Sequence, residues 1–377
     1  MKFYKRFTLG TAALSLAVLL SACGGSEESD TEHASEEDTD VEANEEAEED
    51  ETASDDGEKV TITYARGYDD TEGNERLIEA FMEKHPNIEV VFQEMPADTG
   101  AQHDAYVTAF SAQSSEIDVF DVDVIWPAEF AQANYALELD RFIEQDGIDM
   151  NDYFPGPVQA GNVGGVQYAM PKFTDAGLLY YRSDIIDTPP ATWDELIEMA
   201  EEHQGEEGTQ FGYLLQAAQY EGLVVNATEF IAAYGGEVIN EAGEVVINSP
   251  EAIKGLEKLA EIVSSDITPN DILSFMETET ANSFIQGNAV FARNWPYMQA
   301  SAQGDESDVV GLVDFALLPA GDGGSASGLG GWMTMINRYS ENIEAAWELV
   351  KFMTGPEGQK NYCDVRRKRT NARGALR

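Results

Sequence analysis

Short apolar strand patterns alternate with amphipathic helix patterns from residue 60 onward, and this order restricts the possible fold classes. The first part predicts strands over 60–65, 88–92 and 119–125, with helices over 74–84 and 106–112 between them. Leu77, Ile78 and Phe81 lie on one face of the first predicted helix, which Pro86 would end. A strand–helix–strand order indicates an α/β protein with a largely parallel, doubly wound sheet flanked by helices.

The second half of the chain continues in the same way. It predicts strands over 177–181 and 289–292, and helices over 192–202 and 344–353. Thr192 and Glu195 form a capping box that starts the first of these helices. Trp193 follows a helix cap, and Trp347 lies on a predicted amphipathic helix with Val350 and Phe352, so both are interpreted as structural. About 300 residues exceed the usual size of a single core, so we expect two lobes.

The N-terminus has the pattern of a secretion signal that ends at a cysteine. Lys2, Lys5 and Arg6 precede an apolar run over 11–20 that is too short to span a bilayer. The tetrapeptide LSAC then ends at Cys23. This pattern resembles a bacterial lipoprotein signal, which implies a signal peptide over 1–22, a lipid on Cys23 and an anchor on the outer face of the cell membrane. The alternative is a buried cysteine beside an ordinary signal.

An acidic segment over 23–58 follows the cysteine. From Glu27 to Glu58 the chain holds 18 Asp or Glu residues, no Lys or Arg and no aromatic residue. Because like charges repel and little apolar surface can collapse, we predict a disordered spacer. Capture of cations or of a basic partner is an alternative role for this segment.

Negative charge also dominates the rest of the chain. Residues 60–362 hold 52 Asp or Glu residues against 12 Lys or Arg, a net charge of about −40, which repels nucleic acid and anionic lipid heads. Neither is therefore expected as a partner. Counter-ions would screen such a surface, so a salt-rich or alkaline habitat is our hypothesis. With Cys23 assigned to lipid, a single cysteine remains and no intramolecular disulfide can form.

Five segments in order resemble one family. They are FTDAGLLYYRSD over 173–184, PATWDEL over 190–196, FARNWPY over 291–297, GLGGW over 328–332 and FMTGPEGQ over 352–359. Together they resemble the extracellular solute-binding proteins of sugar ABC transporters, nearest to the trehalose/maltose-binding branch. The resemblance implies a type II periplasmic-binding-protein-like fold, with two α/β lobes joined by crossing strands that close over a sugar. It also implies delivery to permease subunits, a monomer, and no cofactor, metal or catalysis.

The resemblance also implies lobe boundaries and site residues. The N-terminal lobe is expected over 59–170 and 296–340, and the C-terminal lobe over 171–295 and 341–362. The candidate sugar-binding residues are Asp123, Trp126, Phe173, Asp175, Trp295, Tyr297 and Trp332. The chemistry suits a sugar, because carboxylates accept hydrogen bonds from hydroxyl edges and flat rings cover C–H faces. Asp123 follows an apolar strand, where ligands of open α/β sheets bind.

Two other functions use the same residue types. A glycosidase needs two carboxylates across a glycosidic bond, and spacing alone does not exclude it. A metal protein is suggested by Asp118, Asp121 and Asp123, but their spacing lacks the glycine and the final glutamate of a calcium loop. The chain contains no H-E-x-x-H, G-x-S-x-G, P-loop or C-x-x-C motif.

The last residues, 363–377, depart from the family pattern. They hold six of the 22 basic residues of the chain. A permitted back-translation, shifted by one nucleotide, reads Ile-Ala-Met-Ser-Gly-Gly-Asn-Ala-Pro-Thr-Arg-Glu-Ala-Leu-Tyr, which is the continuation that the resemblance implies. We therefore predict a frameshift near Tyr362, natural or from sequencing, with a genuine basic tail as the alternative.

Overall fold

The computed structural model describes residues 59–67 and 73–361. The predicted signal peptide, the lipidated Cys23, the acidic spacer and the tail over 363–377 lie outside these residues. Within the described ranges, no helix has both the length and the apolar composition that a membrane crossing needs.

Five strands form the first sheet, in the order β2-β1-β3-β11-β6. They are β1 (Val60–Gly67), β2 (Ile88–Met95), β3 (Val119–Asp123), β6 (Met170–Ala176) and β11 (Leu329–Ile336). Its helices are α1 (Gly73–Lys84), α2 (Thr99–Ser111), α3 (Pro127–Gln132), α4 (Asp140–Asp146), η1 (Met150–Asp152), α5 (Pro155–Gly161) and α11 (Ile343–Thr354), beside a small ribbon of β4 (Asn162–Val163) and β5 (Val166–Gln167). We call these elements the first lobe.

Four strands form the second sheet, in the order β10-β7-β9-β8. They are β7 (Leu178–Arg182), β8 (Phe211–Leu214), β9 (Ala289–Asn294) and β10 (Val313–Ala316). The accompanying helices are α6 (Trp193–His203), η2 (Glu206–Gly208), α7 (Glu221–Ala233), α8 (Pro250–Val263), η3 (Ile272–Ser274), α9 (Glu277–Ile285) and α10 (Met298–Ala302). We call these elements the second lobe.

Local sequence explains where several helices begin. Thr192 Oγ1 accepts the Glu195 N–H at 3.2 Å, and the Glu195 side chain accepts the Ala191 N–H at 2.7 Å, so α6 starts where the capping pattern predicts. Helix α8 starts with Ser249 as its N-cap and Pro250 in its first turn.

Each lobe has its own apolar clusters, and both tryptophans interpreted as structural lie in them. The Trp193 ring stacks on Phe230 in the second lobe, with 4.1 Å between ring centroids. Trp347 packs against Phe142 in the first lobe, and its Nε1 donates to Asp146 Oδ2 at 2.7 Å. Both predictions are confirmed.

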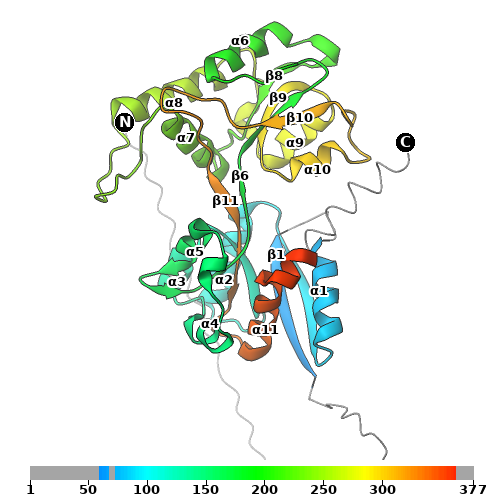
Figure 1. Cartoon of the computed structure of the whole chain (residues 1–377), viewed down its shortest axis with the longest axis vertical. Coiled ribbons are helices and arrows are strands. Elements are labelled where there is room, and N and C mark those ends of the chain that lie inside the picture. The colour runs from blue at the N-terminus through cyan, green and yellow to red at the C-terminus, as the bar shows by residue number, and fades with distance from the viewer. Residues whose placement is uncertain (1–58, 68–72, 362–377) are drawn as a thin grey trace, which may run out of the picture. The chain divides into compact units, whose positions relative to one another are not determined.

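The predicted two-sheet α/β organisation is confirmed, but the prediction of largely parallel sheets is wrong. In the first sheet β1 runs parallel to β2 and β3, whereas β11 is antiparallel to both β3 and β6. In the second sheet only β8 and β9 are parallel. The reason is that β6 leads out of the first lobe and β11 returns to it beside β6 (Figure 1), so the two strands run in opposite directions. We call β6 and β11 the crossing strands.

The expected lobe boundaries are wrong for three segments. Residues 171–176, expected in the C-terminal lobe, belong to β6, which pairs with β11 in the first sheet. Helix α11 belongs to the first lobe, because Trp347 and Val350 share an apolar cluster with Ile62 and Leu77. Strand β10 pairs with β7 and the Met298 side chain packs with Tyr180, so the segment from α10 to β10 belongs to the second lobe. Helix α11 follows the return of the chain through β11, whereas the segment from α10 to β10 precedes that return, and periodicity alone does not indicate where the return lies.

Candidate functional site

Asp123 and Trp332 lie on neighbouring strands at the end of the first sheet. Asp123 is the last residue of β3, and Trp332 of β11 is its partner in the register. Both side chains are partly exposed. Asp123 Oδ1 accepts the Ile125 N–H at 3.2 Å, which fixes the carboxyl at the turn after the strand. The sheet thus places a carboxyl beside a large ring.

The Trp126 ring packs against the Trp332 ring. The two rings meet edge to face, with centroids 5.7 Å apart and planes at 82°. Trp126 is buried and lies nearly parallel to the Phe130 ring in the core of the first lobe. The structure therefore brings Trp126 to the site chiefly through its contact with Trp332. Phe173 of β6 pairs with Trp332 on the other side of β11.

Asp175 and Trp295 meet at a glycine of the second crossing strand. Gly330 of β11 is the register partner of Asp175. A Cβ atom at Gly330 would lie 2.3 Å from Asp175 Oδ1 and 2.7 Å from Cζ3 of the Trp295 ring. No other residue fits there without displacing one of them. The glycine therefore lets a carboxylate of the first crossing strand lie beside a ring of the second lobe.

Glu277, the first residue of α9, holds three aromatic side chains. Trp295 Nε1 donates to Glu277 Oε1 at 3.3 Å, and the Tyr220 hydroxyl donates to Glu277 Oε2 at 2.6 Å. The Tyr297 hydroxyl donates to the Glu277 backbone oxygen at 3.4 Å. Burial raises the pKa values of Tyr220 and Tyr297 above the usual range for tyrosine, so both remain neutral hydrogen-bond donors.

Four carboxyl groups, Asp123, Asp175, Glu221 and Glu277, influence one another at the site. Burial is the largest cause that raises the pKa of Asp123 to about 8, and the charge of Glu221 is the next. Smaller contributions come from Asp175 and Glu277. Burial and then Glu277 also raise the pKa of Glu221. The raised pKa favours the protonated form of Asp123, whose carboxyl can donate a hydrogen bond as well as accept one.

Sequence reasoning missed Tyr220, Glu221 and Glu277. Glu221 and Glu277 are first residues of helices α7 and α9. Acidic residues are common in the first turn of any helix because they stabilise its dipole, so position alone does not mark them as site residues. Only the tertiary fold shows that the first residues of α7 and α9 lie at the same site.

The other two aspartates of the β3 region have structural partners. Asp121 forms an ion pair with Lys172 at 2.6 Å, and Asp118 accepts the Thr63 N–H at 2.8 Å and the Ser340 hydroxyl. Across residues 59–67 and 73–361, His, Cys, Asp and Glu side chains form no group of three or more that could hold a metal ion.

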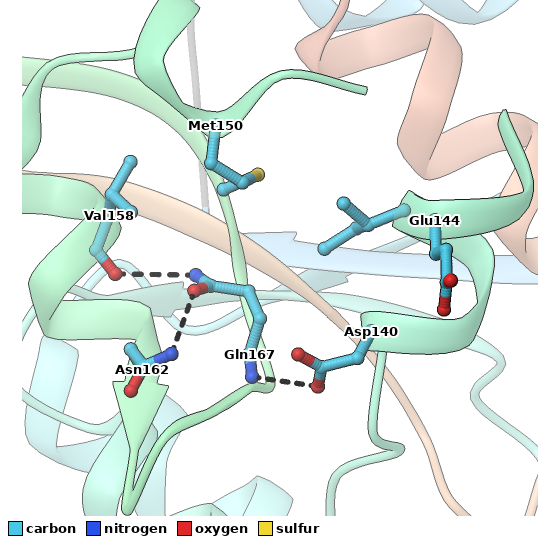
Figure 2. A pocket seen from close by; sticks show the side chains of 7 residues that line it. Asp140, Glu144, Met150, Val158, Asn162 and Gln167 are labelled. Atoms are coloured by element: carbon cyan, nitrogen blue, oxygen red, sulfur yellow. Dashed lines mark hydrogen bonds between the residues drawn. The ribbon is translucent and has the colours of Figure 1, made fainter. Parts of the chain in front are cut away.

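A separate cavity of about 380 Å³ lies in the first lobe, between α4 and α5 (Figure 2). It is lined by Asp140, Ile143, Glu144, Met150, Val158, Asn162 and Gln167. The Gln167 amide donates to the Val158 and Ala169 backbone oxygens, and the Gln167 N–H donates to Asp140 Oδ2. None of the seven predicted site residues lines this cavity, so it is distinct from the candidate site.

The fold and the site place the chain among known proteins. The profile of the family described as bacterial extracellular solute-binding protein matches residues 69–360. A probable ABC transporter-binding protein of Deinococcus radiodurans is 34% identical over 324 residues, which cover 82% of this chain and 75% of that protein. The chain therefore belongs to the bacterial extracellular solute-binding proteins.

Two further relatives have names that state a ligand. The maltose-bound MalE3 structure of T. maritima has a TM-score of 0.75 and 40% identity, and the match covers 80% of this chain and 79% of that one. The maltotriose-binding protein of Pyrococcus abyssi is 25% identical over 309 residues, which cover 79% of this chain and 63% of that protein. The type II binding-protein fold predicted from the sequence is thus confirmed.

Proposed function

We propose that this protein is the sugar receptor of an ABC importer and that it captures an α-linked glucoside such as maltose or trehalose. The observation that carries the proposal is the meeting of Asp123, Asp175, Trp295 and Trp332 at the crossing strands. The likeness to the maltose-bound MalE3 structure supports the sugar class. The family is extracellular, so the chain works outside the cytoplasm.

The arrangement suits the two kinds of surface that a sugar offers. Asp175 accepts hydrogen bonds from hydroxyl groups, while protonated Asp123 donates to a sugar oxygen. The partly exposed rings of Trp332 and Trp295 cover C–H faces of the pyranose. Because these groups come from both lobes, sugar binds the closed arrangement better than the open one and shifts the population towards it. The closed form is then recognised by the permease.

The test is a titration of the soluble protein, starting at Glu58, with maltose, trehalose, sucrose and maltotriose. Tryptophan fluorescence and melting temperature report binding. Asp175→Asn removes a charged acceptor, which is worth about 2 kcal/mol, or roughly 30-fold in Kd. Trp332→Ala should abolish the fluorescence change. Asp149→Asn, at an exposed site in the first lobe, is the matched control and should leave Kd unchanged. Absence of a saturable change with every sugar, in folded protein, would refute the proposal.

One observation favours the enzyme alternative enough to test it. A carboxyl group whose pKa is raised by burial, near other carboxyl groups, is the pattern of a glycosidase general acid. The same titration samples, analysed by chromatography after a long incubation, separate the two functions. A receptor returns its sugar unchanged, whereas accumulation of glucose that depends on Asp123 would favour the enzyme.

The membrane anchor belongs to the same proposal. The lipid on Cys23 would hold the receptor on the outer face of the membrane, with the acidic spacer between the anchor and the lobes. The full chain expressed in a bacterial host should partition into the detergent phase of a Triton X-114 extract. A Cys23→Ala variant should move to the aqueous phase, and equal partitioning of the two would exclude a lipid on this residue.

A further inference from the structure

Two buried ion pairs hold the crossing strands, one in each lobe. We propose that these pairs confine the bending between lobes to residues 173–176 and 329–333, so that lobe movement and sugar binding use the same residues. The proposal rests on the function proposed above. We call the pair of Lys172 with Asp121 the first clamp, and the pair of Arg293 with Glu229 the second clamp.

The first clamp joins both crossing strands to the first lobe. Lys172 of β6 contacts Asp121 of β3 at 2.6 Å, and the two side chains are 3% and 4% exposed. The Thr334 hydroxyl of β11 donates to the other oxygen of Asp121 at 3.1 Å. One carboxylate thus holds β6 and β11 immediately below the residues that carry Phe173 and Trp332.

The second clamp holds the other ends of the same segments. Arg293 forms a two-pronged pair with Glu229, at 2.6 Å and 3.1 Å, and the side chains are 1% and 2% exposed. Glu229 Oε1 also accepts the Gly328 N–H at 3.0 Å, just before β11. A Cβ atom at Gly177, just after β6, would lie 2.5 Å from both Arg293 Nη2 and Glu229 Oε1. Both crossing segments therefore lie directly against this pair.

The second clamp also contacts the site. The Arg293 guanidinium lies 4.0 Å from the centroid of the Trp295 ring, which meets Asp175 at Gly330. Further contacts fix the guanidinium, because Arg293 Nη1 donates to Gln216 Oε1 at 3.1 Å. A ring that stacks on sugar is thus connected, through one side chain, to the ends of both crossing strands.

Stability alone does not account for these pairs. Removing two charges from water costs several kcal/mol, and a buried ion pair is often no more stable than packed apolar residues. A buried pair does, however, enforce one geometry, because a displaced partner leaves an unpaired charge. Stiff ends leave the intervening segments to absorb rotation, and those segments contain Phe173, Asp175 and Trp332. Arg293 and Glu229 are accordingly positioning residues.

The experiment compares Glu229→Gln with Asp184→Asn. Asp184 receives a similar fork from Arg182 in the same lobe, but that pair contacts no crossing segment in the hydrogen bonds of the described residues. The rate of backbone hydrogen exchange in peptides that cover 174–178 and 326–331 is measured without ligand. The Kd is measured by titration with sugar. We expect exchange in these peptides to rise about tenfold in Glu229→Gln, with Kd weakened by a similar factor. Asp184→Asn should change neither quantity.

Unchanged exchange at both peptides in folded Glu229→Gln would overturn the clamp proposal. If that variant does not fold, Arg293→Lys keeps the positive charge while losing the fork, and the same exchange criterion applies. The exchange measurement needs no sugar, so it remains decisive if the wild type binds none of the sugars and the proposed function fails. Closure is followed independently by small-angle scattering with and without sugar.

Discussion

Replacing Asp123 by asparagine should remove a pH dependence from the stability of the folded protein. The ordinary pKa of this carboxyl is 3.8, and burial with nearby negative charge raises it to about 8 in the folded chain. Between these two values the folded protein keeps a proton that the unfolded chain has released. The free energy of unfolding therefore falls as the pH rises from 4 to 8, because Asp123 costs the folded state nothing at acid pH and its cost is largest at pH 8.

The expected size follows from the same shift. Each pH unit inside this window changes the free energy of unfolding by up to about 1.4 kcal/mol, or on the order of 4 kcal/mol between pH 5 and pH 8. The side chain keeps some exposure to water, so we expect about half of this, roughly 2 kcal/mol. For a body of this size that corresponds to about 3 °C in melting temperature.

The assay is thermal unfolding of wild type and Asp123→Asn at pH 5, 6, 7 and 8 in the same salt. Asparagine resembles the protonated carboxyl and can still accept the Ile125 N–H, so the two proteins should be similar at pH 5. At pH 8 the free energy of unfolding should be higher for Asp123→Asn than for wild type by roughly 2 kcal/mol. Asp149→Asn is the control. Hydrogen bonds from Asn151 lower the pKa of Asp149, so the ionised Asp149 stabilises the folded protein and its replacement should not raise the free energy of unfolding at pH 8. If the melting temperatures of wild type and Asp123→Asn change with pH in the same way, the electrostatic account of the site is refuted.

Three other predictions concern packing and charge. Gly330→Ala places a methyl group 2.3 Å from Asp175 Oδ1, so it should cost about 1–3 kcal/mol of stability and weaken sugar binding more than tenfold, as measured by melting and titration; unchanged affinity would contradict the site geometry. Trp347→Phe loses the bond to Asp146, so urea unfolding should show a loss of about 1–3 kcal/mol while Kd stays the same, and altered affinity would contradict a structural role. Because the folded part is strongly acidic, its melting temperature should rise between 0.1 and 2 M NaCl. The same melting temperature at both concentrations would refute the hypothesis of a salt-rich habitat.

Much of the fold could be predicted because local physics decides it. Apolar periodicity located β1, α1 and β2, and the capping residues Thr192 and Glu195 fixed the start of α6. Pairing direction was harder, because an apolar strand reads the same in parallel and antiparallel sheets. The placement of α11 in the first lobe depends on the apolar cluster that Trp347 shares with Ile62 and Leu77 near the start of the described chain, which no local pattern encodes.

The motifs indicate some of the residues that lie together at the candidate site, but not all of them. Asp175, Trp295 and Trp332 lie in segments that resemble the family, and the structure brings all three to the crossing strands. Trp126 was expected as a contact residue, but it is buried against Phe130. The sequence does not indicate Glu277, because its role depends on hydrogen bonds from Tyr220 and Trp295, which lie in other parts of the chain.

The order of elements along the chain has a consequence for the order in which the two lobes fold. The second lobe is built from one continuous stretch, from β7 to β10, whereas the first lobe needs β11 and α11 from near the end. As the chain emerges from its N-terminus, the second lobe can complete its core while the first still lacks β11, the strand between β3 and β6. Contacts of long sequence separation form slowly. Until β11 and α11 are in place, the apolar side chains of β1 and α1 remain uncovered, so the first lobe is the last of the two lobes to become compact.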